Sequence, residues 1–132
     1  MGHPTETQLQ KLNDISHQII GAAIAVHKEL GPGLLESVYE VCLMQEMENQ
    51  GLHTARQVNM PLYYKERQTD KEFRLDLLVE NEVIVELKAV DEILPIHEAQ
   101  LLTYLKLANK HLGLIINFNV PLLREGIRRM VL

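Results

Sequence analysis

The sequence predicts an α/β fold in which a mixed, mainly antiparallel sheet is flanked by helices. Apolar residues recur every three or four positions near the N-terminus and again after Pro95, which is the period of an amphipathic helix. Between these segments, β-branched and bulky residues form short runs separated by turn residues, as in strands. The predicted order is two helices, three strands, a third helix and one or two further strands, which describes an α/β sandwich.

The composition is typical of a folded single domain. The chain has 132 residues, 46% of them apolar, so we expect residues 1–132 to form one domain with one core. Within this range, residues 1–6 are expected to be a flexible tail. No apolar run reaches the roughly 20 residues of a membrane span. One cysteine, Cys42, excludes an internal disulfide and suits the cytoplasm.

The net charge of −5 argues against a protein that coats nucleic acid through bulk positive charge. It does not exclude an enzyme that acts on phosphodiesters at one local site, because acidic residues can gather at a metal with a few basic residues around it.

The first predicted element is an amphipathic helix over residues 7–30. Its apolar stripe consists of Leu9, Leu12, Ile15, Ile19, Ala22, Ala23, Val26 and Leu30. The sequence Gly31-Pro32-Gly33 ends this helix sharply. A second helix should span about residues 35–50, with Val38 and Cys42 in its apolar stripe.

A β region follows. The pattern of residues 54–67 predicts one long or broken strand in which Pro61 marks an edge or a bulge. Residues 71–79 and 82–90 are the next two predicted strands, and a short polar turn at Glu80–Glu82 joins them.

The last third of the chain adds a helix and the final strands. Residues 96–109 follow the helical period. The side chains expected to face inward from this helix are Ile96, Ala99, Leu102 and Leu105, with Leu101 and Leu107 as further candidates. Residues 111–118 form an apolar strand in this prediction, and residues 123–132 a short strand or a helical turn.

Charged residues interrupt the strand at residues 82–90. Glu86 and Lys88 lie two positions apart among apolar residues, and burying charge is costly unless it is paired or holds a metal. If Val79 pairs with Val83 across a three-residue turn, Asp76 falls opposite Glu86. The same alternation places Phe73, Leu75, Leu77 and Val79 together on the other face.

Two adjacent carboxylates repel unless one is protonated or a cation lies between them. Mg²⁺, or Mn²⁺ in its place, is often held by one or two carboxylates together with waters and a substrate phosphate. Lys88 could orient the attacking water or stabilise charge on the phosphate. These residues therefore indicate metal-assisted phosphodiester hydrolysis. The alternative is a solvated sheet face with a cross-strand ion pair.

Two short motifs accompany the carboxylate pair. Gly33 to Tyr39 has the pattern G-x-x-E-x-x-Y, with Glu36 in the first turn of the second helix, where an acidic residue also complements the helix dipole. Gln100 and Tyr104 form a Q-x-x-x-Y pattern at i, i+4 spacing. Its alternative explanation is the polar edge of an amphipathic helix.

Together and in this order, these motifs resemble those of the GxxExxY proteins, a branch of the PD-(D/E)xK nuclease superfamily. The resemblance runs from about Leu12 to the C-terminus. It implies a core of a helix, three antiparallel strands, a helix and a further strand, which agrees with the order above. One departure is Leu75, because the residue before the acidic position is proline in the superfamily motif.

The resemblance implies a role for each site residue. Asp76 and Glu86 would be metal ligands, Glu36 would complete the metal site, and Lys88 would activate water. Gln100 and Tyr104 resemble a helix motif of the RecB-like nucleases that orients the site or touches the nucleic acid. The implied cofactor is Mg²⁺ or Mn²⁺, and the implied substrate is nucleic acid, DNA before RNA.

His27 is a further candidate metal ligand, because RecB-like nucleases use a helix histidine in this role. The alternative is a histidine at the edge of the core that bonds to the backbone. Two sets of basic residues could form a phosphate-binding strip or simply a solvated surface: Arg56, Lys65, Arg67 and Arg74, and Arg124, Arg128 and Arg129.

Three functions remain open from the sequence. The first is a Mg²⁺-dependent nuclease, the second a nucleic-acid-binding or regulatory module with little turnover, and the third an oligomeric interaction protein with a vestigial site. The intact set of Glu36, Asp76, Glu86 and Lys88 favours the nuclease, while the net acidity and small size favour the other two. A compact core without a separate DNA-reading domain also predicts a homo-oligomer.

Overall fold

A computed structural model describes residues 2–132. The elements are α1 (Glu6–Leu30), α2 (Glu36–Asn49), β1 (Thr54–Tyr64), β2 (Arg67–Val79), β3 (Val83–Lys88), α3 (Pro95–Ala108), β4 (Leu112–Asn117), the 3-10 helix η1 (Leu123–Gly126) and β5 (Ile127–Val131). This order confirms the predicted α/β fold. The C-terminal segment forms a helical turn and then a strand, so both alternatives predicted for residues 123–132 occur in it.

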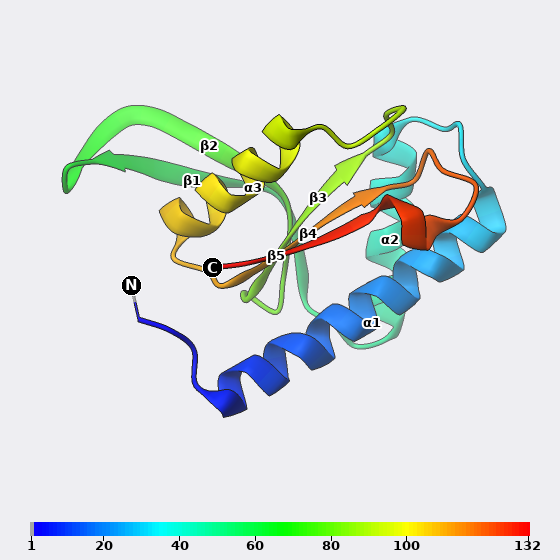
Figure 1. The fold of residues 1–132 in the computed structure, drawn as a ribbon, viewed down its shortest axis with the longest axis horizontal. Helices are drawn as coiled ribbons and strands as arrows, with labels where there is room; N and C mark the ends of the chain where they lie inside the picture. Colours follow the sequence, from blue (N-terminus) through cyan, green and yellow to red (C-terminus); the bar gives the residue numbers. More distant parts are fainter. Residues whose placement is uncertain (1) are drawn as a thin grey trace.

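The five strands form one mixed sheet in the order β1-β2-β3-β4-β5. β3 and β4 are parallel, with α3 as the crossover between them, and the other neighbours are antiparallel. Figure 1 shows α1 and α2 on one face of the sheet and α3 on the other. A larger part of the core therefore lies beneath α1 and α2, and a smaller part beneath α3.

α1 begins earlier than predicted. The Thr5 hydroxyl accepts a hydrogen bond from the Gln8 amide, while the Gln8 side chain accepts one from the Thr5 amide. These two bonds form a capping box, for which Thr-x-x-Gln is a sequence signature. Glu6 thus belongs to the helix rather than to the predicted tail, and Met1 lies outside the described residues. α1 is 25 residues long, yet within residues 2–132 neither it nor another helix has the hydrophobicity that a membrane span requires.

The buried faces of the helices differ in part from the predicted ones. In α2, Tyr39, Leu43 and Met47 are buried and Val38 is exposed, because the Tyr39 ring stacks on Phe118 at a centroid distance of 4.3 Å. Leu30, at the end of α1, is also exposed.

In α3, Leu101 and Leu105 are buried, whereas Leu107 near the end is exposed. Ile96 and Ala99, both predicted to face inward, are also exposed. Leu101 packs directly on β4, since a Cβ added to Gly113 would lie 2.7 Å from its Cδ1 atom. This close approach at Gly113 selects the face of α3 that is buried.

The β1–β2 hairpin bends at its centre. The pairs Arg56–Leu77 and Val58–Leu75 flank Gln57, whose φ is 50°. Leu77 packs beneath α1 and α2, but Leu75 packs beneath α3. The predicted placement of Phe73, Leu75, Leu77 and Val79 on one face is therefore wrong, because the positive φ turns the outer half of the hairpin toward α3. Asp76 lies opposite this turning point.

β1 is an edge strand, and its register with β2 shifts between Pro61 and Tyr63. Proline has no amide hydrogen for the ladder, so this position tolerates it. The prediction of an edge or a bulge at Pro61 is confirmed in both respects.

Candidate active site

Asp76 and Glu86 lie side by side where β2 and β3 separate. Val79–Val83, Leu78–Ile84 and Leu77–Val85 are paired in the ladder, and the two acids are next in register. At this point, hydrogen bonds from backbone amides to the two carboxylates replace the backbone–backbone bonds of the ladder. The Asp76 amide donates to Glu86 Oε2, and the Leu87 amide donates to Asp76 Oδ2, both over 2.9 Å. Each carboxylate is thus held by the backbone of the other strand.

Glu86 is almost fully buried, with 5% of its surface exposed. Burial, followed by the neighbouring carboxylate of Asp76, raises the pKa of Glu86 from 4.5 to about 8, although the Asp76 amide and Lys88 act in the opposite direction. At neutral pH the pair therefore favours a bound proton or a nearby cation over two bare negative charges.

Glu36 and Lys88 belong to the same electrostatic cluster. Glu36 begins α2, and Lys88, the last residue of β3, is half-buried. Burial raises the pKa of Glu36, Lys88 opposes that rise, and Asp76 adds to it. Glu36 is exposed as a residue, so its carboxylate lies at the mouth of the site rather than in its interior.

α3 brings Tyr104 to the carboxylate pair. Burial raises the pKa of the Tyr104 hydroxyl, and the charges of Glu86 and Asp76 raise it further. The ring packs against Phe73 with centroids 5.2 Å apart. Gln100 lies one helical turn earlier on the same side of α3, where it is exposed. Its side chain forms no hydrogen bond within residues 2–132, which leaves it available at the border of the site.

Tyr39 holds the loop that places Glu36. Its hydroxyl donates to Gly31 O over 2.6 Å and accepts from the Leu34 amide over 3.1 Å, while its ring is fully buried against Phe118. The last residue of the G-x-x-E-x-x-Y motif therefore fixes the turn that precedes α2. This role of Tyr39 was not predicted from the sequence, although the motif itself contained the signal.

Replacing Tyr39 with phenylalanine should lower the free energy of unfolding by about 1–3 kcal/mol, because Gly31 O and the Leu34 amide both lose a partner. Chemical denaturation measures this change. Tyr63→Phe is the matched control, since Tyr63 is exposed and should change stability by less than about 0.5 kcal/mol. Equal stability of Tyr39→Phe and wild type would show that these bonds do not hold the loop.

Asn117 fixes the segment that follows Lys88. Asn117 pairs with Lys88 in the parallel ladder, and its buried carboxamide accepts from the Val90 amide over 3.1 Å and donates to Val90 O over 2.9 Å. This positioning residue was missed in the sequence, where a polar residue near the end of an apolar strand gave no distinct signal.

His27 lies apart from the carboxylates. Its Nε2 is 2.8 Å from Val120 O, and a carbonyl oxygen can only accept, so Nε2 carries a proton. The structure therefore places His27 in the backbone-bonded arrangement that was the alternative to metal ligation.

The donor set at Asp76 and Glu86 fits a divalent cation held by two carboxylates. Each uses one oxygen for a backbone amide, and Asp76 Oδ1 and Glu86 Oε1 accept no hydrogen bond from residues 2–132. In this part of the chain, no three His, Cys, Asp or Glu side chains gather as a metal site. Two carboxylates with waters and phosphate oxygens suffice for Mg²⁺, and Glu36 as a third ligand stays a prediction.

The sequence model of the PD-(D/E)XK nuclease superfamily matches residues 13–130, a range that includes every residue of the candidate site. A search of the curated proteins found no match.

Among solved structures, the fold is similar to that in the crystal structure of a protein called SSO0001. The TM-score is 0.52 and the sequence identity 19%, over 73% of this chain and 50% of that one. The chain thus spans about half the length of that protein. At this identity the likeness shows the fold alone.

Proposed function

The chain belongs to the PD-(D/E)XK nuclease superfamily, and from this premise we propose that it is a metal-dependent nuclease of the GxxExxY branch, which hydrolyses phosphodiester bonds in DNA rather than RNA. The observation that supports the proposal most strongly is the reciprocal bonding of Asp76 and Glu86 to each other's strand. It aligns two carboxylates beside Lys88, at a point where a buried pair would otherwise repel.

In this proposal Asp76 and Glu86 hold Mg²⁺ or Mn²⁺. The bound ion would neutralise the carboxylate pair, polarise a phosphate oxygen and make water more acidic. The ammonium of Lys88 orients the attacking water and stabilises the negative charge that grows on the phosphate oxygens. Glu36, whose pKa is raised, accepts the proton that the water releases. Tyr104 donates a hydrogen bond to the phosphate from the α3 side.

The direct test is cleavage of labelled single- and double-stranded DNA and RNA, with Mg²⁺, with Mn²⁺ and with a chelator. Asp76→Asn and Lys88→Met, purified in the same way, control for contaminating nucleases. Cleavage by wild type alone, and only with metal, is expected. If wild type binds nucleic acid without cleaving it under every metal, the second function considered above, a binding module with the nuclease fold, replaces this proposal.

Asp76→Asn should separate metal binding from folding. In chelator, the variant should melt at the same temperature as wild type or higher, because removing one of two adjacent carboxylates relieves repulsion. Adding Mg²⁺ should raise the melting temperature of wild type by mass action and that of the variant much less. Thermal shift measurements with increasing Mg²⁺ test this, and equal shifts in both proteins would contradict ligation by Asp76.

A further inference from the structure

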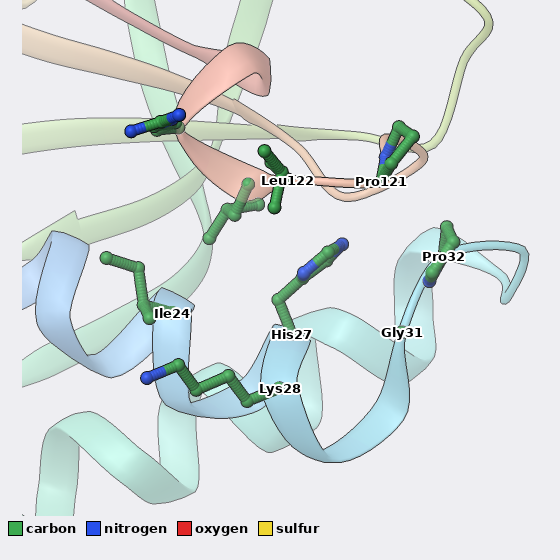
Figure 2. Close-up of a pocket in the computed structure, with 9 residues that line it drawn as sticks. Ile24, His27, Lys28, Gly31, Pro32, Pro121 and Leu122 are labelled. Carbon is green, nitrogen blue, oxygen red and sulfur yellow. The ribbon is translucent and has the colours of Figure 1, made fainter.

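A pocket separate from the carboxylate site lies between the end of α1 and the segment that leads into η1 (Figure 2). Its volume is about 600 Å³, within the range of small-molecule sites. Figure 2 shows the His27 ring on one side, and Pro121 and Leu122 on the other. Ile24 and Pro32 also line it, so most of its wall is apolar.

The charged side chains at this pocket are both basic. Lys28 and Arg124 line it, and no acidic residue does, although the net charge of the chain is −5. Within residues 2–132 neither side chain has an ion pair or a hydrogen bond. Among the other arginines, Arg56 pairs with Glu40, Arg128 bonds to backbone carbonyls and Arg129 bonds to Asn13, while Arg67 and Arg74 have no such partner within these residues. The pocket therefore suits an anion with an apolar body.

His27 forms a rigid part of the pocket wall. The residue is 8% exposed, and the bond from Nε2 to Val120 O fixes the plane of the ring. A planar group in the pocket would pack mainly against the exposed residues Pro32, Pro121 and Leu122, with the fixed His27 ring at its edge. A nucleobase joined to a phosphate suits this apolar wall with basic residues at its border.

One loop connects this pocket to the carboxylate site. Gly31 and Pro32 line the pocket, and Glu36 begins α2 four residues after Pro32. Four residues span at most about 14 Å, while stacked nucleotides of one strand are about 3.4 Å apart. A strand that passes Glu36 at the mouth of the site therefore reaches the pocket within about four nucleotides. Tyr39 holds the intervening loop in place.

We propose that this pocket binds one nucleobase and its phosphate from a single-stranded nucleic acid, a few nucleotides from the bond at the carboxylate site. The inference deepens the proposed nuclease function and rests on it. A base within a duplex cannot enter the pocket unless it leaves the stack, so the proposal names a single strand as the substrate.

The test measures binding without cleavage. Fluorescence anisotropy in chelator compares about 12 nucleotides of thymidine with an abasic strand of equal length, which keeps the phosphates and lacks the bases. Leu122→Asp and Arg124→Glu alter the pocket at exposed positions, where folding should be preserved, and circular dichroism checks this. Lys106→Glu, an equal charge change on α3 outside the pocket, is the matched control.

Wild type should bind the thymidine strand roughly tenfold or more tightly than the abasic strand, the effect of one stacked base. Leu122→Asp should lose most of this preference, Arg124→Glu should weaken the binding of both strands, and Lys106→Glu should behave like wild type. The inference is overturned if all four proteins show the same preference, if wild type shows none, or if free thymidine monophosphate binds as tightly as the strand.

This experiment also separates the inference from the proposed function. Lys88→Met should retain the pocket-dependent preference, because its change lies at the carboxylate site. Pocket-dependent binding by a wild type that cleaves nothing would refute the nuclease proposal and leave the binding site standing.

Discussion

Replacement of Lys88 by alanine should slow cleavage by roughly 10²-fold or more, the scale of losing one electrostatic catalytic group. Lys88 lies at the end of β3 beside Glu36, Asp76 and Glu86. A site that only binds a metal has no need of an ammonium, because the ammonium repels the ion. A nuclease tolerates this repulsion, since the lysine acts on the attacking water and on charge that grows at the phosphate.

The control for packing is Lys88→Met, which keeps an apolar stem of similar length. Both variants should cleave at the same low rate, while Mg²⁺ should raise their melting temperatures at least as much as that of wild type. Single-turnover cleavage and thermal shift measure the two properties on the same preparations. If wild type cleaves and both variants cleave as fast, Lys88 is not catalytic.

Much of the fold was accessible from the sequence because short-range patterns determine it. The turn at Glu80–Glu82 has three residues, so the register Val79–Val83 follows, and with it the approach of Asp76 to Glu86. Likewise, the period of apolar residues located all three helices to within a few residues. In these segments local propensity and tertiary packing favour the same structure.

The errors occurred where tertiary contacts override local patterns. The positive φ of Gln57 turns the β1–β2 hairpin, and strict alternation cannot anticipate a backbone twist at a residue other than glycine. Tyr39 was noted only as the last residue of the G-x-x-E-x-x-Y motif, but its ring packs in the core and its hydroxyl holds the loop. The pocket at His27 is lined by residues 24–32 and 121–124, which lie nearly a hundred residues apart. No local sequence pattern can therefore predict it.

Glu86→Gln should change how the stability of the metal-free protein depends on pH. The pKa of Glu86 is about 8 in the folded protein and has an ordinary value of 4.5, so the folded state binds the proton more tightly. This contribution to stability is fully present below pH 4.5 and is lost as the pH rises through about 8. Between these values, wild type should lose on the order of a few kcal/mol that the glutamine variant does not lose.

Thermal melts in chelator at about pH 6 and about pH 9 measure the effect, and a few kcal/mol corresponds to a difference on the order of 10 °C between the two proteins. Glutamine keeps an oxygen that can accept from the Asp76 amide, so the variant changes the charge and preserves the bond. A parallel decline in both proteins would show that Glu86 is not the group responsible.

At the higher pH, added Mg²⁺ tests whether a cation binds at the ionised carboxylate pair. When both carboxylates are ionised, only added positive charge can offset their repulsion, and the ammonium of Lys88 leaves the pKa of Glu86 at about 8. A cation at Asp76 and Glu86 should therefore restore most of the stability that wild type loses above this pH. The same concentration of Mg²⁺ should stabilise Glu86→Gln much less. Equal stabilisation of the two proteins would mean that the ion binds elsewhere and that the carboxylate pair is held together by a proton alone.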